Sequence, residues 1–219
     1  MEVKACIFDL DGVICDTAKY HYLAWKELAD SLGFEFTPED NERLKGVSRM
    51  ASLDILLEIG GLTFDAQKKH QMAEEKNKRY REYIFKMNPD EILPGVLSFL
   101  DELKRSGISI ALGSASKNAK TILERLGILS LFDAIVDGSM VQHAKPNPEV
   151  FLLGAKLVGV QPTESVVFED AQAGIQAALN GGMVAIGIGD KPVLQKAHYV
   201  ADGFKDFTLK KLREIVVNL

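Results

Sequence analysis

Short apolar runs that alternate with helix-like segments constrain the fold of this chain more than any other feature. Each run ends at a small or acidic residue; the runs are Val3–Phe8, Ile108–Leu112, Ala134–Val136, Ser165–Phe168 and Met183–Ile188. Such runs are typical of strands that are buried on both faces. Strands alternating with helices predict an α/β fold, with a Rossmann-like parallel sheet and right-handed crossovers.

The segment between the first two runs breaks this alternation, because it shows no strand pattern. Helical spacing is found instead around Tyr20–Leu32, Pro38–Leu44, Arg49–Ile59 and Asp65–Met87. This pattern predicts a four-helix cap inserted after the first strand. We expect a core domain of residues 1–15 and 89–219 and a cap domain of residues 16–88. Two linkers between them predict a hinge that opens and closes over the end of the first strand.

Composition and charge exclude several other classes of protein. Apolar residues make up 47% of the 219 residues, which excludes a disordered chain. The net charge of −5 argues against a nucleic acid or an anionic membrane surface as the main partner. Asp9 and Asp11 come too early for a signal peptide, and no apolar run is long enough to span a membrane. With cysteine only at Cys6 and Cys15, we expect a reduced, cytoplasmic protein, and a monomer by default.

Chemically active side chains follow four of the predicted strands. In the order of the strands they are Asp9 with Asp11, Ser114, Lys145, and Glu169 with Asp170. Ligands bind beyond the carboxyl ends of parallel strands, so these side chains are expected at one edge of the sheet. Clustered carboxylates favour Mg²⁺, which shares its coordination with substrate phosphate oxygens. An aspartate in such a cluster can attack phosphorus, and a lysine and a hydroxyl can stabilise the phosphoryl group.

The chain resembles the haloacid dehalogenase superfamily over nearly its whole length. The resemblance lies in four motifs, which are Phe8-Asp9-Leu10-Asp11-Gly12-Val13, Ser114, Lys145-Pro146 and Glu169-Asp170. It implies that Asp9 is the nucleophile, that Asp11 is the general acid/base, and that Ser114 and Lys145 bind the transferring phosphate. The implied Mg²⁺ ligands are Asp9, Asp11 through its backbone carbonyl, Glu169 and Asp170. A halide needs no proton to leave, so the second aspartate favours phosphatases and mutases over dehalogenases.

Further segments are similar to the hexose-phosphate mutases of that superfamily. They are Asp16–His21, Ala24–Lys26, Leu44–Arg49 and Ala115–Asn118. This similarity implies that Arg49 and Lys117, helped by Ser116 and Asn118, hold the non-reacting phosphate. His21 and Lys76 are expected around Asp11, with Thr17 at the hinge. The remaining candidate substrate contacts are Trp25, Lys45, Gly46, Val47, Ser48 and Ala115.

The resemblance implies an isomerase that interconverts β-glucose 1-phosphate and glucose 6-phosphate. Its intermediates would be an aspartyl-phosphate and a glucose 1,6-bisphosphate. A sugar-phosphate phosphatase is the alternative, because it needs the same core motifs. A phospho-accepting signalling module also uses an aspartate, a lysine and a hydroxyl on a parallel sheet. The helical insert and Asp11 argue against that third possibility, because such a module needs neither.

Overall fold

The computed structural model describes residues 2–44 and 47–219, and in these residues six parallel strands form one sheet. The strands are β1 (Ala5–Phe8), β2 (Ser109–Gly113), β3 (Ala134–Val136), β4 (Ser165–Glu169), β5 (Val184–Ile188) and β6 (Tyr199–Ala201). Their order across the sheet is β3-β2-β1-β4-β5-β6, and Cys6 of β1 pairs with Ile110 on one side and Val166 on the other. The strand order reverses between β1 and β4, and loops that diverge at such a point leave a crevice for a ligand.

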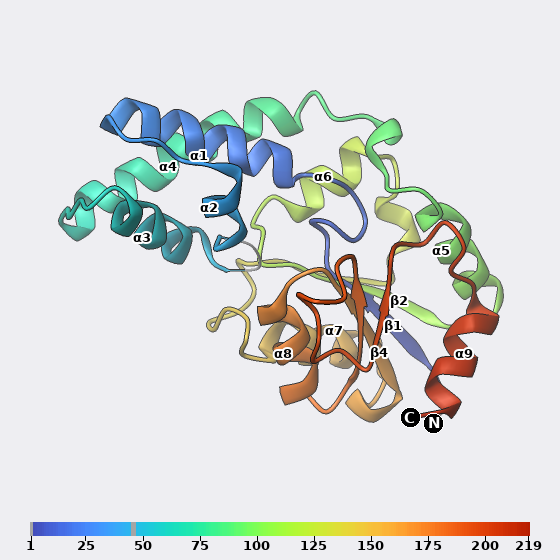
Figure 1. Ribbon diagram of the computed structural model, residues 1–219. Coiled ribbons are helices and arrows are strands. Elements are labelled where there is room, and N and C mark those ends of the chain that lie inside the picture. Colours follow the sequence, from blue (N-terminus) through green and yellow to red (C-terminus); the bar gives the residue numbers. More distant parts are fainter. Residues whose placement is uncertain (1, 45–46) are drawn as a thin grey trace.

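Helices cover both faces of this sheet (Figure 1). The core helices are α5 (Val96–Arg105), α6 (Ala119–Arg125), α7 (Glu149–Leu157), α8 (Gln172–Asn180) and α9 (Leu209–Val217), with short 3-10 turns η1 (Pro89–Glu91), η2 (Leu129–Leu131) and η3 (Pro162–Glu164). Phe8 and Phe168 share an apolar cluster with α5, α6 and α9, whereas Ile7 and Val167 share one with α7 and α8. The strands are therefore buried on both faces, which explains their continuous apolar sequences.

An aromatic cluster supports the two strands that carry the acidic motifs. The Phe8 and Phe168 rings stack with centroids 4.8 Å apart, and Phe99 meets both edge-on. Phe204 and Phe207 extend the cluster along the same face. Offset-stacked and edge-to-face rings pack tightly and resist rearrangement. The strands β1 and β4 are therefore held in place by tightly packed aromatic rings.

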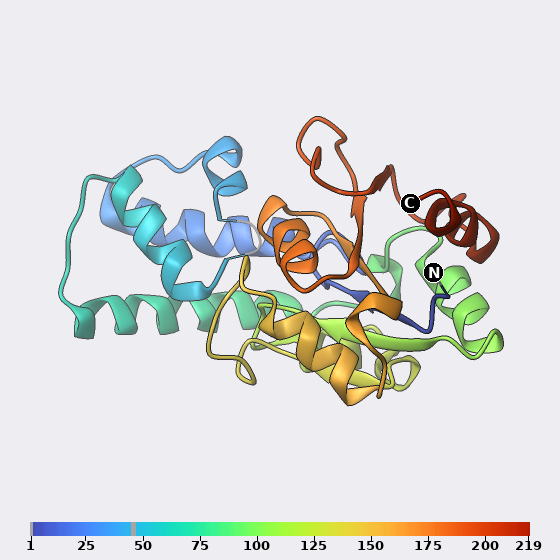
Figure 2. The same ribbon diagram turned by 90° about the horizontal axis from the view of Figure 1, so that it is seen from below.

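The helical insert has its own apolar core beside the sheet (Figure 2). Its helices are α1 (Ala18–Leu32), α2 (Pro38–Glu42), α3 (Arg49–Ile59) and α4 (Ala66–Ile84). Trp25, Leu28, Leu53, Leu56 and Met72 are buried together in this core. These helices, together with the parallel sheet, confirm the predicted fold class, whereas the domain limits at residues 15/16 and 88/89 stay a prediction.

Side-chain caps fix the starts of three of these helices. Thr37 and Asp40 form a reciprocal capping box at α2. Ser48 accepts from the Ala51 N–H at the start of α3, and Asp65 caps α4 in the same way. The cap at Ser48 matters for the site, because it fixes the position of the first turn of α3.

The C-terminal region departs from the sequence prediction. The strand β6 and helix α9 were not predicted from the sequence, because a three-residue edge strand carries too short a pattern to recognise. In the part of the chain that the structure describes, no helix combines the length and apolar character needed to cross a membrane. Cys6 and Cys15 are both buried free thiols. The cytoplasmic location and the monomeric state stay predictions.

Candidate active site

Three carboxylates meet at the ends of the two central strands. Asp9 follows β1, Glu169 ends β4, and Asp170 follows it. One oxygen from each of the three lies within 4.8 Å of the others. The Asp9 N–H donates to the Phe168 carbonyl at 2.9 Å, which continues the β1–β4 pairing beyond the strand. An all-oxygen cluster of this kind suits a hard divalent cation, so the residues fit the metal that the sequence motif implies.

Lys145 enters this cluster from the loop after β3. Its Nζ donates to Asp9 Oδ1 at 2.5 Å and to Glu169 Oε2 at 2.8 Å, and its side chain is 1% exposed. Burial alone would lower the pKa of Lys145, but the two carboxylates outweigh burial and raise this pKa above its usual range. The ammonium is therefore charged at neutral pH and holds both carboxylates in place.

Two glycines that the sequence analysis did not single out permit this close approach. Gly12 has φ +77°, and a Cβ there would clash with the Asp170 carboxylate. Gly174 lies in α8, where a Cβ would clash with the Glu169 carboxyl group. The Gly12 signal was present in the sequence, because a glycine directly after Asp-x-Asp marks a turn with positive φ. The Gly174 signal was absent, because its contact is formed only by packing.

The Asp11 carboxyl lies beside Asp9 and is suited to proton transfer. The Asp11 backbone N–H donates to Asp9 Oδ2 at 3.0 Å, so both oxygens of Asp9 are held. Among the residues described, the Asp11 Oδ1 atom is buried without a hydrogen-bond partner. Burial, and next the charge of Asp9, raise the pKa of Asp11 to about 7. Such a group can both give and take a proton near neutral pH.

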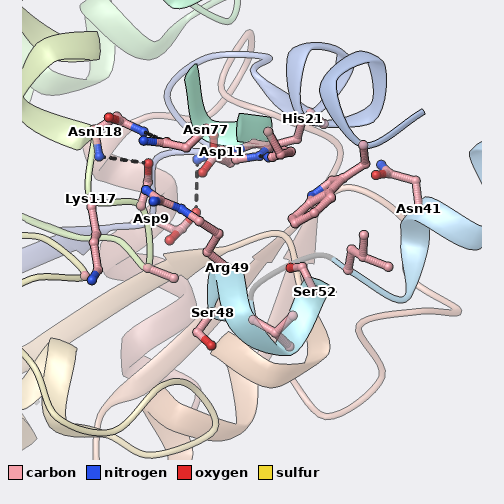
Figure 3. Close-up of a pocket in the computed structure, with 18 of the residues that line it drawn as sticks. Asp9, Asp11, His21, Asn41, Ser48, Arg49, Ser52, Asn77, Lys117 and Asn118 are labelled. Carbon is pink, nitrogen blue, oxygen red and sulfur yellow. Dashed lines mark hydrogen bonds between the residues drawn. The ribbon is translucent and has the colours of Figure 1, made fainter. Parts of the chain in front are cut away.

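A pocket opens above the carboxylates, between the sheet edge and the helical cap (Figure 3). Most of the predicted site residues line it; these are Asp9, Asp11, His21, Trp25, Val47, Ser48, Arg49, Lys76, Ala115, Ser116, Lys117, Asn118 and Asp170. Ser114 and Lys145 line a neighbouring second pocket, whereas Thr17 and Glu169 are fully buried. Lys45 and Gly46 lie outside the described residues. Lining residues that the sequence analysis missed include Asn41, Ser52, Asn77 and Gly138.

The loop after β2 is ordered by its own side chains. The Ser116 N–H donates to Ser114 Oγ at 3.1 Å, and the Asn118 N–H donates to Ser116 Oγ at 3.2 Å. Asn118 then reaches the cap, because its Nδ2 donates to Asn77 Oδ1 of α4 at 3.0 Å. The missed residue Asn77 therefore joins cap and core directly at the pocket wall.

Cationic and aromatic cap residues surround the pocket above Asp11. Lys76 Nζ lies 2.8 Å from His21 Nδ1 and 4.3 Å from the Trp25 ring centroid. Burial, and next Lys76, lower the pKa of His21, so the imidazole beside Lys76 is neutral. Burial, and next Arg49, lower the pKa of Lys76 as well. Trp25 belongs to the cap core and also lines the pocket, so one side chain serves both the packing of the cap and the pocket wall.

Comparisons with known proteins agree with this geometry. Residues 3–182 match the family of haloacid dehalogenase-like hydrolases. The chain is 42% identical over 214 residues to the β-phosphoglucomutase of Bacillus subtilis, covering 97% of this chain and 95% of that protein. The crystal structure of β-phosphoglucomutase from Clostridium difficile superposes with a TM-score of 0.95 at 43% identity, over 99% of this chain and 98% of that one. A fructose-1-phosphate phosphatase of Escherichia coli is 36% identical over 186 residues, covering 83% of this chain and 94% of that protein.

Proposed function

Because the chain belongs to the family of haloacid dehalogenase-like hydrolases, we propose that it acts on phosphorylated sugars as a β-phosphoglucomutase, interconverting β-D-glucose 1-phosphate and D-glucose 6-phosphate. The observation that carries this proposal is the arrangement of one pocket. Asp9 and Asp11 line it together with the cap residue Arg49 and the core residue Lys117. A mutase needs two phosphate sites, one at the reacting aspartates and one at the cations. The phosphate that does not react must be held while the other is transferred.

Asp9 is the proposed nucleophile. Lys145 and the Asp11 N–H hold its two oxygens, so the carboxylate is oriented before the substrate arrives. Its attack on phosphorus forms a bond from the Asp9 carboxylate to phosphorus and breaks the bond from phosphorus to the sugar oxygen. Lys145, Ser114 and nearby backbone N–H groups would stabilise the negative charge on the phosphoryl oxygens.

Asp11 is the proposed general acid/base. When the phosphoryl group moves to Asp9, the protonated Asp11 carboxyl gives its proton to the departing sugar oxygen. In the return step the Asp11 carboxylate takes the proton from the sugar hydroxyl that attacks the aspartyl-phosphate. The pKa of about 7 populates both protonation states at neutral pH. The two half-reactions together move the phosphate between the two ends of the sugar through the 1,6-bisphosphate.

Asp9, Glu169 and Asp170 are the side chains proposed to hold Mg²⁺, together with the backbone carbonyl of Asp11. A bound Mg²⁺ supplies positive charge that offsets the repulsion between the carboxylates and the phosphate oxygens. The contact between Gly12 and the Asp170 carboxylate supports this assignment, because it brings the Asp11–Gly12 turn against a carboxylate of the cluster.

Arg49 and Lys117 are proposed to bind the non-reacting phosphate, with Ser116 and Asn118 beside them. Figure 3 shows the Arg49 side chain reaching from α3 toward the part of the pocket where Asp9 and Asp11 lie. Val47, Ser48 and Ala115 complete the wall, and the assignment of Lys45 and Gly46 rests on the sequence motif alone. His21 and Lys76 are proposed to contact the substrate near Asp11, and Thr17 to lie at the hinge.

A sugar-phosphate phosphatase is the second candidate, favoured by the similarity to the fructose-1-phosphate phosphatase. The two candidates differ in whether a sugar hydroxyl or water accepts the phosphoryl group from Asp9. We expect the enzyme, supplied with Mg²⁺ and catalytic β-glucose 1,6-bisphosphate, to convert β-glucose 1-phosphate into glucose 6-phosphate. A coupled dehydrogenase assay measures glucose 6-phosphate, a parallel assay measures free phosphate, and Asp9→Asn serves as the inactive control. Rapid release of free phosphate without glucose 6-phosphate would favour the phosphatase.

A further inference from the structure

Arg49, the proposed ligand of the non-reacting phosphate, already has an anionic partner within its own chain. Its Nη1 donates to Glu74 Oε1 at 2.6 Å. Arg49 lines both the active-site pocket and the second pocket beside it, and Glu74 lines the second pocket from α4. Glu74 therefore approaches the Arg49 guanidinium from the side of the second pocket. The resemblance to the superfamily assigns no role to Glu74.

Arg49 is one of several cations at the active-site pocket. Arg49, Lys76 and Lys117 all line it, and the proximity of Arg49 to Lys76 is repulsive enough to contribute to the lowered pKa of Lys76. Arg49 is also the first residue of α3, where the helix dipole disfavours a cation. A carboxylate beside Arg49 relieves both effects when no phosphate is bound.

A substrate phosphate changes the role of this carboxylate. Two anions that approach one guanidinium repel each other, and the carboxylate neutralises part of the charge that attracts the phosphate. The Glu74 side chain is 70% exposed, so it has room to turn away into solvent when a phosphate arrives. The Arg49 side chain is only 20% exposed and stays at the boundary between the two pockets.

We propose that Glu74 is a positioning residue that competes with the substrate phosphate for Arg49. This competition keeps the affinity of the site for that phosphate moderate. This inference rests on the proposed mutase function. In each turnover the bisphosphate must release one phosphate from Arg49 and present the other. Binding that is equally tight in all states lowers KM without raising kcat, and it delays this exchange. The Glu74 carboxylate forms its ion pair with the Arg49 guanidinium again as the phosphate leaves.

The test compares Glu74→Gln with the wild-type chain, using glucose 6-phosphate as the probe in titration calorimetry. We expect the Kd for glucose 6-phosphate to fall about two- to fivefold, the range that a partly exposed ion pair supports. We expect KM to fall with it, while kcat does not rise. Glu74→Ala should shift Kd in the same direction, because it also removes the charge. A role that only supports the cap would predict the opposite shift, a higher Kd.

Glu58→Gln is the matched control. Glu58 also pairs with a cap arginine, Arg43, at 3.0 Å, and its side chain is likewise 70% exposed, but neither residue lines the active-site pocket. We expect this variant to bind glucose 6-phosphate with the wild-type Kd. An unchanged or weaker affinity in Glu74→Gln, or an equal gain in Glu58→Gln, would overturn the inference. Failure of the wild-type chain to form glucose 6-phosphate would instead overturn the proposed function. The measured Kd values would still show whether Glu74 competes for Arg49, because calorimetry does not depend on turnover.

Discussion

At the scale of single residues, burial sets the chemistry of Asp11. In an unfolded chain an aspartic acid loses its proton near pH 3.9. In the folded protein the pKa of Asp11 is raised to about 7, first by burial and then by the charge of Asp9. Between these two pH values the folded protein retains a proton that the unfolded chain has lost. The contribution of Asp11 to the free energy of unfolding therefore falls as the pH rises from about 4 to about 7.

Asp11→Asn should separate activity from stability. We expect phosphoryl transfer to sugar to fall by about 10²- to 10⁴-fold, because the amide cannot exchange the proton. We also expect the Tm to rise at pH 7.5, by about 2–4 °C for each kcal/mol gained, because a charged carboxylate is no longer buried. Calorimetry in the presence of EDTA measures the second effect. An equal gain in Tm at pH 5.0, where the wild-type carboxyl of the folded chain is protonated, would contradict the assigned pKa.

Lys145→Met tests whether the buried ammonium holds the carboxylates in place. The change leaves Asp9 and Glu169 buried without their shared counter-charge. Removing one partner of a buried ion pair costs about 3–5 kcal/mol of unfolding free energy, which urea denaturation measures. Lys4→Met is the control, because Lys4 pairs with Glu164 on the surface. We expect the control to unfold at nearly the wild-type urea concentration, and an equal loss in both variants would contradict the role of Lys145.

At the scale of structural elements, the turn after β1 determines the geometry of the acidic cluster of Asp9, Glu169 and Asp170. β1 itself fixes Asp9 at the sheet edge, but the approach of Asp170 from the end of β4 depends on the absence of a side chain at Gly12. The same turn aims the Asp11 N–H at Asp9. One tight turn therefore positions the proposed nucleophile, the proposed proton donor and a proposed metal ligand relative to each other.

Gly12→Ala should weaken metal binding more than it weakens the fold. The methyl group would displace the Asp170 carboxylate, and we expect activity to need at least about tenfold more Mg²⁺, the loss seen when groups that orient metal ligands are disturbed. Gly33→Ala is the matched control, because Gly33 has φ +85° but open space where the Cβ would lie. Both variants carry the strain of a positive φ, so their Tm values should fall similarly. Equal Mg²⁺ requirements in the two variants would refute the steric argument.

At the scale of the whole molecule, side-chain hydrogen bonds join the helical cap to the core at separate points. Asn118 donates to Asn77 at the pocket wall, and Tyr20 of α1 donates to Glu91 of η1 at 2.6 Å near the linkers. Contacts of this kind suit the proposed cap, which would open to admit substrate and close to exclude water from the proposed aspartyl-phosphate.

A double-mutant cycle with Asn77→Ala and Asn118→Ala tests the contact at the pocket wall. We expect each single variant to lower kcat/KM, because a hydrogen bond between the cap and the core is lost. The two changes should be coupled by about 0.5–1.5 kcal/mol in the transition-state free energy, the range for a neutral hydrogen bond. Strictly additive effects would show that the two amides act independently. The rate of burst phosphorylation of Asp9 supplies a second measure of cap closure.

The sequence alone predicted the parallel sheet, the helical insert and most residues of the pocket. Strands buried on both faces have continuous apolar runs in the sequence, and helices have periodic apolar positions. Local sequence patterns therefore predict both kinds of element. The carboxyl ends of parallel strands share one edge, which is why residues as distant in the chain as Asp9, Lys145 and Glu169 could be expected to lie together. The short edge strand β6 was missed, because its pattern is too brief.

Only the tertiary structure decided the remaining features. Asn77 and Glu74 are ordinary residues of a polar helix in the sequence, and their contacts with Asn118 and Arg49 exist only once α4 packs beside α3 and the core loop. The neutral state of His21 and the raised pKa of Asp11 likewise depend on how much water packing removes around them. Local patterns specify which elements form, whereas burial and pairwise charge are properties of the assembled chain, because they depend on distances between residues far apart in sequence.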